Sequence, residues 1–225
     1  MHGGFGERPD ARNQDADSGV IDRLESGQEP ARVAADLGLK PSDLIAALTA
    51  GALGSGTIDG PPLVRSTPGH PRLLAALSEP ALAGIYPGAT RPARLALAAG
   101  LLQVHDFWDA SHHAAQEADD LGERRVSAYW HGIAHRREPD PGNAAYWFRR
   151  VGRHPLFAAL TAAARPVLEA SAVAPSLTDR LLPRNAWDPF AFIDLCAGAG
   201  PAETAIARKL QRLELWLLME ASLPD

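Results

Sequence analysis

The sequence predicts an all-α protein, built as a helical bundle-like domain with a small N-terminal helical appendage. In residues 201–221, apolar side chains recur at spacings of three and four, which place them on one face of an α-helix. No segment shows the sustained alternation of apolar and polar residues that is typical of a β-strand. The chain has 225 residues, 46% of them hydrophobic, which suffices for one principal domain with a core.

The chain divides into four regions by composition. Residues 1–19 are polar, charged and rich in glycine, so we expect a disordered tail. Residues 20–52 predict a small helical hairpin, and the Gly- and Pro-rich residues 53–71 predict a linker or a long loop. Residues 72–225 predict the main all-α domain.

The spacing of helices and turns expected in the hairpin of residues 20–52 resembles that of a helix-turn-helix. Gly27, Gly38 and Gly51 lie where the C-terminal caps of three short helices are expected. A DNA-reading helix needs basic or amide side chains that contact phosphates and base edges, but residues 42–48 contain no Lys or Arg. We therefore expect a packing unit that does not bind DNA.

The main domain is expected to open with a short helix in residues 72–90 and to continue with one long helix and several shorter ones. Asn143 is suited to cap the helix that follows the Pro- and Gly-containing turn at 138–143. Pro166 is expected to interrupt the helix after that. The expected helical segments are 91–120, 124–138, 143–151, 154–172, 187–198 and 201–221.

Charge and cysteine content exclude several classes of protein. The net charge of -5 disfavours a general nucleic-acid binder or a protein of anionic membrane surfaces. Cys196 is the only cysteine, so no intrachain disulfide can form, and a reduced intracellular setting fits. The sequence offers no apolar signal segment and no apolar run that could span a bilayer. We expect a cytoplasmic protein without a nucleic-acid or membrane partner.

The long expected helix carries polar residues on a face that we expect to be buried. At 100° per residue, His105, Asp109, His112 and Gln116 continue the apolar face of residues 98–102. Polar groups on a buried face are unfavourable unless each finds a partner. This stripe therefore predicts a polar site inside the protein.

The next helix carries a second polar stripe, formed by His131, His135 and Glu138, which lie within about 60° of one another. Only a few residues join the two helices, so we expect antiparallel neighbours whose stripes meet in one pocket. The charges support this pairing. Residues 103–123 carry six acids and no Lys or Arg, whereas residues 124–155 carry seven Arg and two acids.

A metal site is the leading interpretation of this pocket. Two histidines at positions i and i+4 of a helix can bind one ion. Asp109 and His112 have the spacing by which helical bundles present a carboxylate and an imidazole. Such a set suits a divalent zinc, iron or manganese ion. The expected metal ligands are His105, His112, His131 and His135.

We expect this metal to serve an enzyme, and hydrolysis is the favoured reaction, because a metal with an open position activates water. Glu138 would be a base, Arg137 a clamp for an anionic group, and Asp109 a metal ligand or a residue that orients one. The expected substrate is a small molecule, and an anionic one would suit Arg137.

Two alternatives stay open. Without a metal, the same side chains could perform general acid–base chemistry or bind a small anionic molecule. They could also form the structural network of a scaffold protein, in which His–carboxylate bonds hold two helices in register. The chain reads HGIAH at 131–135, so the HExxH mechanism of zincins is excluded.

The segments HDFWDASHHAAQ (105–116) and YWHGIAHRREPDPGNAAYWFRRVGRHP (129–155) resemble a family of bacterial and fungal proteins whose activity is unknown. The family signature has the form HDxxDxSHxxxQ…YWHxIxHRREPDxxNxxYWFRRVGxHP, and WDPFAFIDLC (187–196) also resembles it. His113 falls where the signature has no fixed residue, which agrees with its place to one side of the polar stripe. The resemblance leaves residues 1–70 outside and implies no particular reaction.

Overall fold

Helices form the regular structure of the protein. The computed structural model describes residues 19–54, 61–170 and 174–224, and these ranges contain α- and 3-10 helices but no strand. The all-α prediction is confirmed. Of the tail expected over residues 1–19, residues 1–18 lie outside the described ranges, and residues 19–25 are helical.

Proline lies in the first turn of most helices, where its fixed φ suits the helix and its missing N–H is not needed. Within the described ranges, two 3-10 helices occur, at Pro71–Leu74 and Pro183–Asn185. The α-helices, in chain order, are α2 (Pro30–Leu37), α3 (Pro41–Leu53), α4 (Glu79–Ile85), α5 (Arg91–Val104), α6 (Trp108–Asp120), α7 (Ser127–Arg137), α8 (Pro141–Val151), α9 (Leu156–Glu169), α10 (Ala174–Leu181), α11 (Pro189–Gly198) and α12 (Pro201–Ser222).

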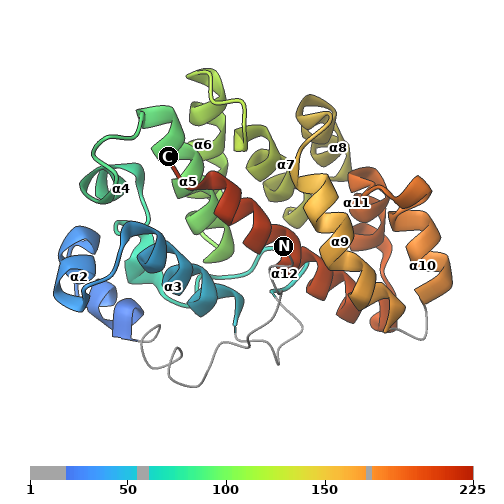
Figure 1. Ribbon diagram of the computed structural model, residues 1–225, viewed down its shortest axis with the longest axis horizontal. Coiled ribbons are helices and arrows are strands. Elements are labelled where there is room, and N and C mark those ends of the chain that lie inside the picture. The colour runs from blue at the N-terminus through green and yellow to red at the C-terminus, as the bar shows by residue number, and fades with distance from the viewer. Residues whose placement is uncertain (1–18, 55–60, 171–173, 225) are drawn as a thin grey trace, which may run out of the picture.

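The helix α5 lies inside the bundle, and the long helix α12 crosses the molecule beside it (Figure 1). Residues 95–104 of α5 are all buried. A helix that is buried around its circumference must be apolar on every side, and α5 meets this condition with Leu, Ala, Gly and Val at nearly every position. It contacts α3, α4, α6, α7 and α12.

Two clusters of buried apolar side chains form the core, and α12 contributes to both. Its Ile206 and Leu210 pack with side chains of α9, α10 and α11. Its Leu215 and Leu218 pack with side chains of α3, α5 and α7. Burial of apolar surface stabilises the fold by roughly 25 cal/mol per Å². The two clusters are therefore joined through one continuous helix.

The expected N-terminal appendage shares the core of the main domain. Val33 of α2 and Leu44 of α3 are fully buried in the same cluster as α5. Gly38 ends α2 in a left-handed conformation, with φ 65, as the sequence predicts. Gly51 does not end its helix, because α3 continues beyond it and Gly54 follows the last turn.

The single helix expected over 91–120 is wrong, because the chain turns between α5 and α6. Asp106 has a left-handed conformation, with φ 64. The N–H of Phe107 donates to the carbonyl of Leu102 (2.9 Å), and the N–H of Asp106 donates to that of Gln103 (3.3 Å). These two bonds form a Schellman motif, a common end of an α-helix, with Asp where Gly is usual.

Tertiary contacts hold Asp106 in this conformation. Its carboxylate accepts hydrogen bonds from Nη2 of Arg137 (2.7 Å) and from the hydroxyl of Ser66 (2.7 Å). The Arg137 side chain is 0% exposed, and its Nη1 also donates to the carbonyl of Gln103 (2.8 Å). The end of α7 is therefore bonded to the end of α5.

Three other expected boundaries are wrong. The cap of α8 is Asp140, whose carboxylate accepts from the N–H of Asn143 (3.0 Å), so Asn143 lies inside the helix. The helix α9 continues through Pro166 to Glu169, although the proline removes one helical hydrogen bond, and buried residues of one helix face lie on both sides of it (Leu160, Ala164 and Leu168). The short helix expected in 72–90 is replaced by the first 3-10 helix and α4.

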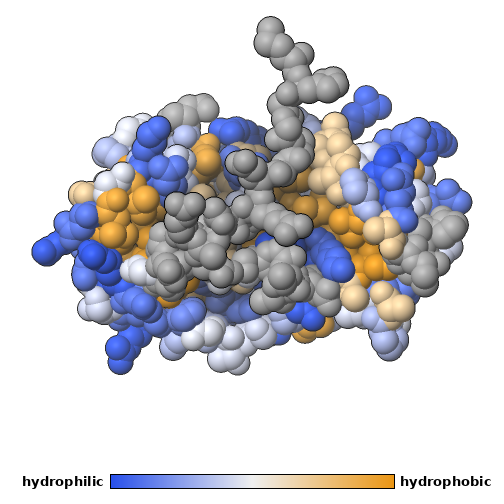
Figure 2. Space-filling model, turned by 60° about the horizontal axis from the view of Figure 1, so that its bottom comes forward, coloured by the Kyte–Doolittle hydropathy of each residue, from blue (hydrophilic) through white to orange (hydrophobic). Residues whose placement is uncertain are grey.

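The surface is mixed in polarity. Figure 2 shows hydrophilic side chains over much of one face, with hydrophobic patches among them. In the part of the chain that the structure describes, no helix is both long and apolar enough to span a membrane. The exposed large hydrophobic side chains, which come from different elements, include Leu37, Val64, Leu74, Leu121, Tyr146 and Phe190.

Gly100 of α5 makes room for the ring of Trp130 on α7. A Cβ atom at residue 100 would lie 2.6 Å from Cζ2 and 2.8 Å from Cε2 of this ring. We expect Gly100→Ala to lower the free energy of unfolding by about 1–3 kcal/mol, because the overpacked core must shift. Urea unfolding followed by circular dichroism measures this change.

Gly198→Ala is the matched control, because residue 198 is also helical and nothing lies within 4 Å of a Cβ added there. It should leave the stability unchanged or raise it by up to about 1 kcal/mol. A Gly100→Ala protein as stable as the wild type would contradict the close approach of α5 and α7.

Candidate metal centre

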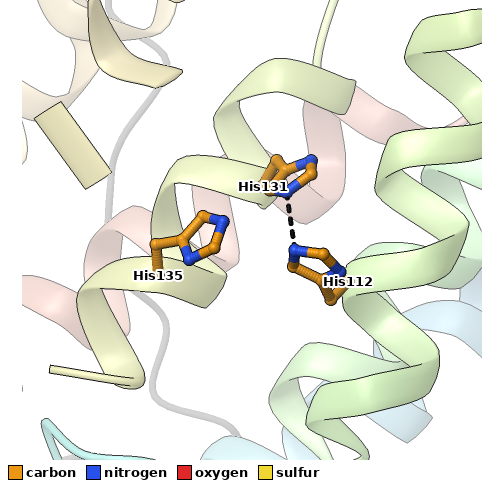
Figure 3. Close-up of side chains that lie close together, drawn as sticks. All are labelled: His112, His131 and His135. Atoms are coloured by element: carbon orange, nitrogen blue, oxygen red, sulfur yellow. Dashed lines mark hydrogen bonds between the residues drawn. The ribbon is translucent and has the colours of Figure 1, made fainter. Parts of the chain in front are cut away.

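Three histidines from two helices lie together. His112 belongs to α6, and His131 and His135 lie one turn apart on α7. Figure 3 shows the His131 and His112 rings joined by a hydrogen bond, with the His135 ring beside them. The bonded Nε2 atoms are 2.8 Å apart. Each ring offers one nitrogen, and these three nitrogens lie within 4.8 Å of one another.

Helix geometry and one cap position these side chains. Residues four apart lie on one face of a helix, so His131 and His135 both face α6. At the start of α7, the Glu123 carboxylate accepts from the N–H of Val126 (3.0 Å) and of Ser127 (2.6 Å). These bonds satisfy donors that a helix leaves free at its N-terminus, and they fix where α7 begins after α6.

Two tryptophan rings flank the cluster. Trp108 stacks on His112 with ring centres 5.0 Å apart, and Trp147 stacks on His131 at 3.8 Å. The indole N–H of Trp108 donates to the carbonyl of Ala134 (2.7 Å), which anchors that ring to α7. Stacked on these rings, the two imidazoles have little freedom to rotate.

Carboxylates adjoin the cluster at the end of α7. Oε2 of Glu138 lies 3.1 Å from Nδ1 of His135, so this nitrogen carries the proton and donates to the carboxylate. The bond leaves Nε2 of His135 as the nitrogen that can bind a metal. Asp140 lies beside this pair, and one possible ligand atom from each of His135, Glu138 and Asp140 falls within 4.8 Å of the others.

The surroundings favour neutral imidazoles. Burial lowers the pKa of His131 from 6.5 to about 3, and the charges of His112, His135 and Arg150 act in the same direction. Burial, followed by the charges of His135 and His113, also lowers the pKa of His112. Nδ1 of His131 is buried and has no hydrogen-bond partner among the described residues. His112 and His131 are therefore neutral, as metal-binding imidazoles must be, but their hydrogen bond requires that one of the two Nε2 atoms carry a proton, which an ion would displace.

The structure does not bring His105, Asp109 or Arg137 into the cluster. His105 is buried at the end of α5, where its Nε2 lies 3.1 Å from the carbonyl of Leu48 in α3. Asp109 is exposed on α6. Arg137 is buried in its pair with Asp106 and does not reach an anionic ligand at the histidines.

The remaining residues of the polar stripes are placed as follows. Glu138 joins the cluster through His135. His113 is exposed and stays outside the cluster, in agreement with its position to one side of the stripe. Gln116 is half-buried and donates to the carboxylate of Asp120 (2.8 Å). The turn at Asp106 explains why the stripe divides, since residues before and after it no longer share a helix axis.

Sequence reasoning missed a buried ion pair next to the site. Arg136 donates to Glu214 of α12 through Nη2 (2.5 Å), and both side chains are at most 1% exposed. The hydroxyl of Tyr129 donates to the same carboxylate (3.0 Å). The signal was present, because Glu214 lies four residues from both Leu210 and Leu218, on the buried face of α12.

No family model matches the chain, no curated protein matches it, and no solved structure matches it. The resemblance of residues 105–155 to a bacterial and fungal family therefore stays a prediction from the motif. The functional argument rests on the geometry of the cluster.

His105 makes the stability of the fold depend on pH. Burial lowers its pKa from 6.5 to about 4 in the folded protein, whereas the unfolded chain keeps the ordinary value. As the pH falls, the unfolded chain binds this proton first. The contribution of neutral His105 is thus complete above pH 6.5 and is lost between pH 6.5 and about 4.

Over this pH range, we expect the free energy of unfolding to fall by about 3 kcal/mol less in His105→Gln than in the wild type. The glutamine amide can donate to the carbonyl of Leu48, and it does not titrate. Urea unfolding near neutral pH and near pH 4 measures the difference. His113→Gln is the control, since it makes the same change at an exposed residue away from Leu48, and it should lose nearly as much stability over this range as the wild type. The same pH dependence in all three proteins would rule out the role of His105.

Proposed function

We propose that the protein is a metal-dependent enzyme of the hydrolytic class, in which His112, His131 and His135 bind one divalent ion. The observation that carries the proposal is the convergence of three ring nitrogens from two helices within 4.8 Å. Three histidine ligands leave a fourth position open, as catalytic zinc sites require, whereas structural zinc sites are closed by four protein ligands.

The geometry needs little adjustment to accept an ion. In a tetrahedral site with metal–nitrogen bonds of about 2.0–2.1 Å, ligand nitrogens lie about 3.3 Å apart. The His112 and His131 nitrogens are closer than this, at 2.8 Å, and all three nitrogens lie within 4.8 Å of one another. An ion would replace the hydrogen bond between His112 and His131, whose rings the tryptophan stacks already hold close together.

Glu138 supports the site by orienting His135. A carboxylate that accepts from Nδ1 of a ligating histidine fixes the ring and directs Nε2 to the metal. The base role expected for Glu138 from the sequence is therefore better assigned as positioning. Asp140 adds a second carboxylate at this side, which offsets the charge of a divalent ion.

A metal with an open position activates water for attack on a substrate and polarises the bond that breaks. His112 is only half-buried, so the cluster borders on solvent at α6. Arg65 places its guanidinium carbon 4.4 Å from the centre of the Trp108 ring, close to His112. This cation supports a small anionic substrate. Zinc is the favoured ion, because three imidazoles suit it and it has no geometric preference of its own.

Metal binding is tested with chelator-treated protein, titrated with Zn²⁺ against a chromophoric competitor and with Co²⁺ by visible absorption. The wild type should bind one ion, and the Co²⁺ spectrum should be that of a tetrahedral site. His112→Ala should weaken binding at least tenfold, because it removes one of three ligands. His113→Ala is the matched control, since it removes an exposed neighbour on the same helix.

If the wild type binds neither ion, the metal proposal is wrong. The metal-free alternative, in which the histidine and carboxylate network is structural or binds an anion directly, would replace it. Equal losses in the two variants would show that a nonspecific surface site was measured.

Hydrolysis is tested separately with 4-nitrophenyl acetate and bis(4-nitrophenyl) phosphate. The Zn²⁺-loaded wild type should release nitrophenolate, and His112→Ala should lower the rate by about 100-fold or more, because the activated water is lost. Glu138→Gln should lower metal affinity by about 10- to 100-fold with the cluster otherwise intact. Stoichiometric metal without turnover of either substrate would keep the metal site and remove the hydrolytic assignment.

A further inference from the structure

A second site lies where the chain between α6 and α7 meets α8. A cavity of about 270 Å³ opens there. Ligand pockets of this size hold small molecules or a single charged group of a larger one. The charged residues that line the cavity are Asp119, Arg124, Arg125 and Arg150, and the lining also includes His154 and Tyr129.

Asp119 organises two of the arginines. Its Oδ1 accepts from Nη1 of Arg124 (3.2 Å), and its Oδ2 accepts from Nη2 of Arg150 (2.6 Å). Arg125 donates through Nη2 to the carbonyl of Ala221 (2.9 Å). A guanidinium has five N–H groups, so these bonds orient the three side chains without using all their donors.

The lining carries a surplus of positive charge. Three arginines and one aspartate give it a net charge of +2. Glu123, the residue before Arg124, directs its carboxylate to the N–H groups of Arg125 and Val126 at the start of α7. Arg124 is 63% exposed and Arg150 is 41% exposed, so an anion can reach both guanidinium groups from solvent.

His154 also lines the cavity, and hydrogen bonds hold its ring in place. Its Nδ1 accepts from the N–H of Leu156 (3.2 Å), so its Nε2 carries the proton and donates to the carbonyl of Arg125 (2.6 Å). The ring also packs against Tyr129 at 5.3 Å between ring centres. These contacts join the backbone of residue 125 to the start of α9, so the cavity is held from both sides.

We propose that this cavity binds a phosphoryl dianion, either inorganic phosphate or the phosphate group of a small monoester. Arginine pairs with phosphate through two parallel N–H···O bonds, and a lining of net charge +2 matches a dianion better than a monocarboxylate. The site does not depend on a metal. It adjoins the histidine cluster, because the Trp147 ring contacts both His131 (3.8 Å) and Arg150 (5.2 Å).

The test is isothermal titration calorimetry of the protein as purified with inorganic phosphate, phenyl phosphate and acetate at constant ionic strength. Phosphate or phenyl phosphate should bind at least tenfold more tightly than acetate. Tighter binding of phenyl phosphate would assign a monoester, and equal or tighter binding of inorganic phosphate would assign the free ion. Absence of binding by both at millimolar concentration overturns the proposal.

Arg150→Gln and Arg124→Gln should each weaken phosphate binding about tenfold, since each removes charge-assisted hydrogen bonds. Arg149→Gln is the control, because it makes the same charge change at an exposed neighbour on α8 that does not line the cavity. Equal losses in all three variants overturn the proposal in favour of general charge attraction.

Phosphate could also bind to a metal at the histidines, so the titration is repeated with His112→Ala. Binding that persists in this variant and is lost in Arg150→Gln belongs to the arginine cavity. Binding that disappears with His112 overturns the cavity assignment. Circular dichroism confirms folding, and Arg124, which is 63% exposed, provides a variant that leaves the core untouched.

Discussion

The ion pair between Arg137 and Asp106 is the constraint on which the candidate metal centre depends. Arg137 is the last residue of α7, and Asp106 occupies the left-handed turn between α5 and α6. A guanidinium that is 0% exposed is strongly unfavourable without a partner. The pair therefore fixes three helix ends at one point. Because α6 starts from this turn, its direction, and with it the approach of His112 to α7, follows from the pair.

Arg136, the residue before Arg137, connects α7 to α12 and α11. Arg136 pairs with Glu214 of α12, and its guanidinium carbon lies 4.6 Å from the centre of the Phe192 ring of α11. Two consecutive arginines thus hold α7 between α5 and α12. A helix fixed in this way presents His131 and His135 in one orientation, which is the preorganisation that the proposed metal site would need.

Helix periodicity predicts what depends on a single helix and misses what depends on contacts between helices. The pair His131 and His135 lies within one unbroken helix, so its geometry could be read from a spacing of four. The turn at Asp106 could not, because residues 105–107 contain neither Gly nor Pro and every local preference there permits a helix. Arg137 and Ser66, both distant in the sequence, stabilise the turn, and this is why helix periodicity places His105 among the wrong neighbours. The N-cap of α8 could not be assigned from the sequence either. Asp140 and Asn143 lie three positions apart and are both good N-cap residues, and the structure uses Asp140.

The position of α12 in the chain has a consequence for biosynthesis. This helix lies between the two apolar clusters and follows, in sequence, every helix that it touches. While the chain emerges from the ribosome, both clusters therefore keep an open apolar groove until residues 206–219 have left the exit tunnel. Until then the nascent chain exposes the apolar surface that α12 covers, and the two clusters are closed together by one late helix rather than segment by segment.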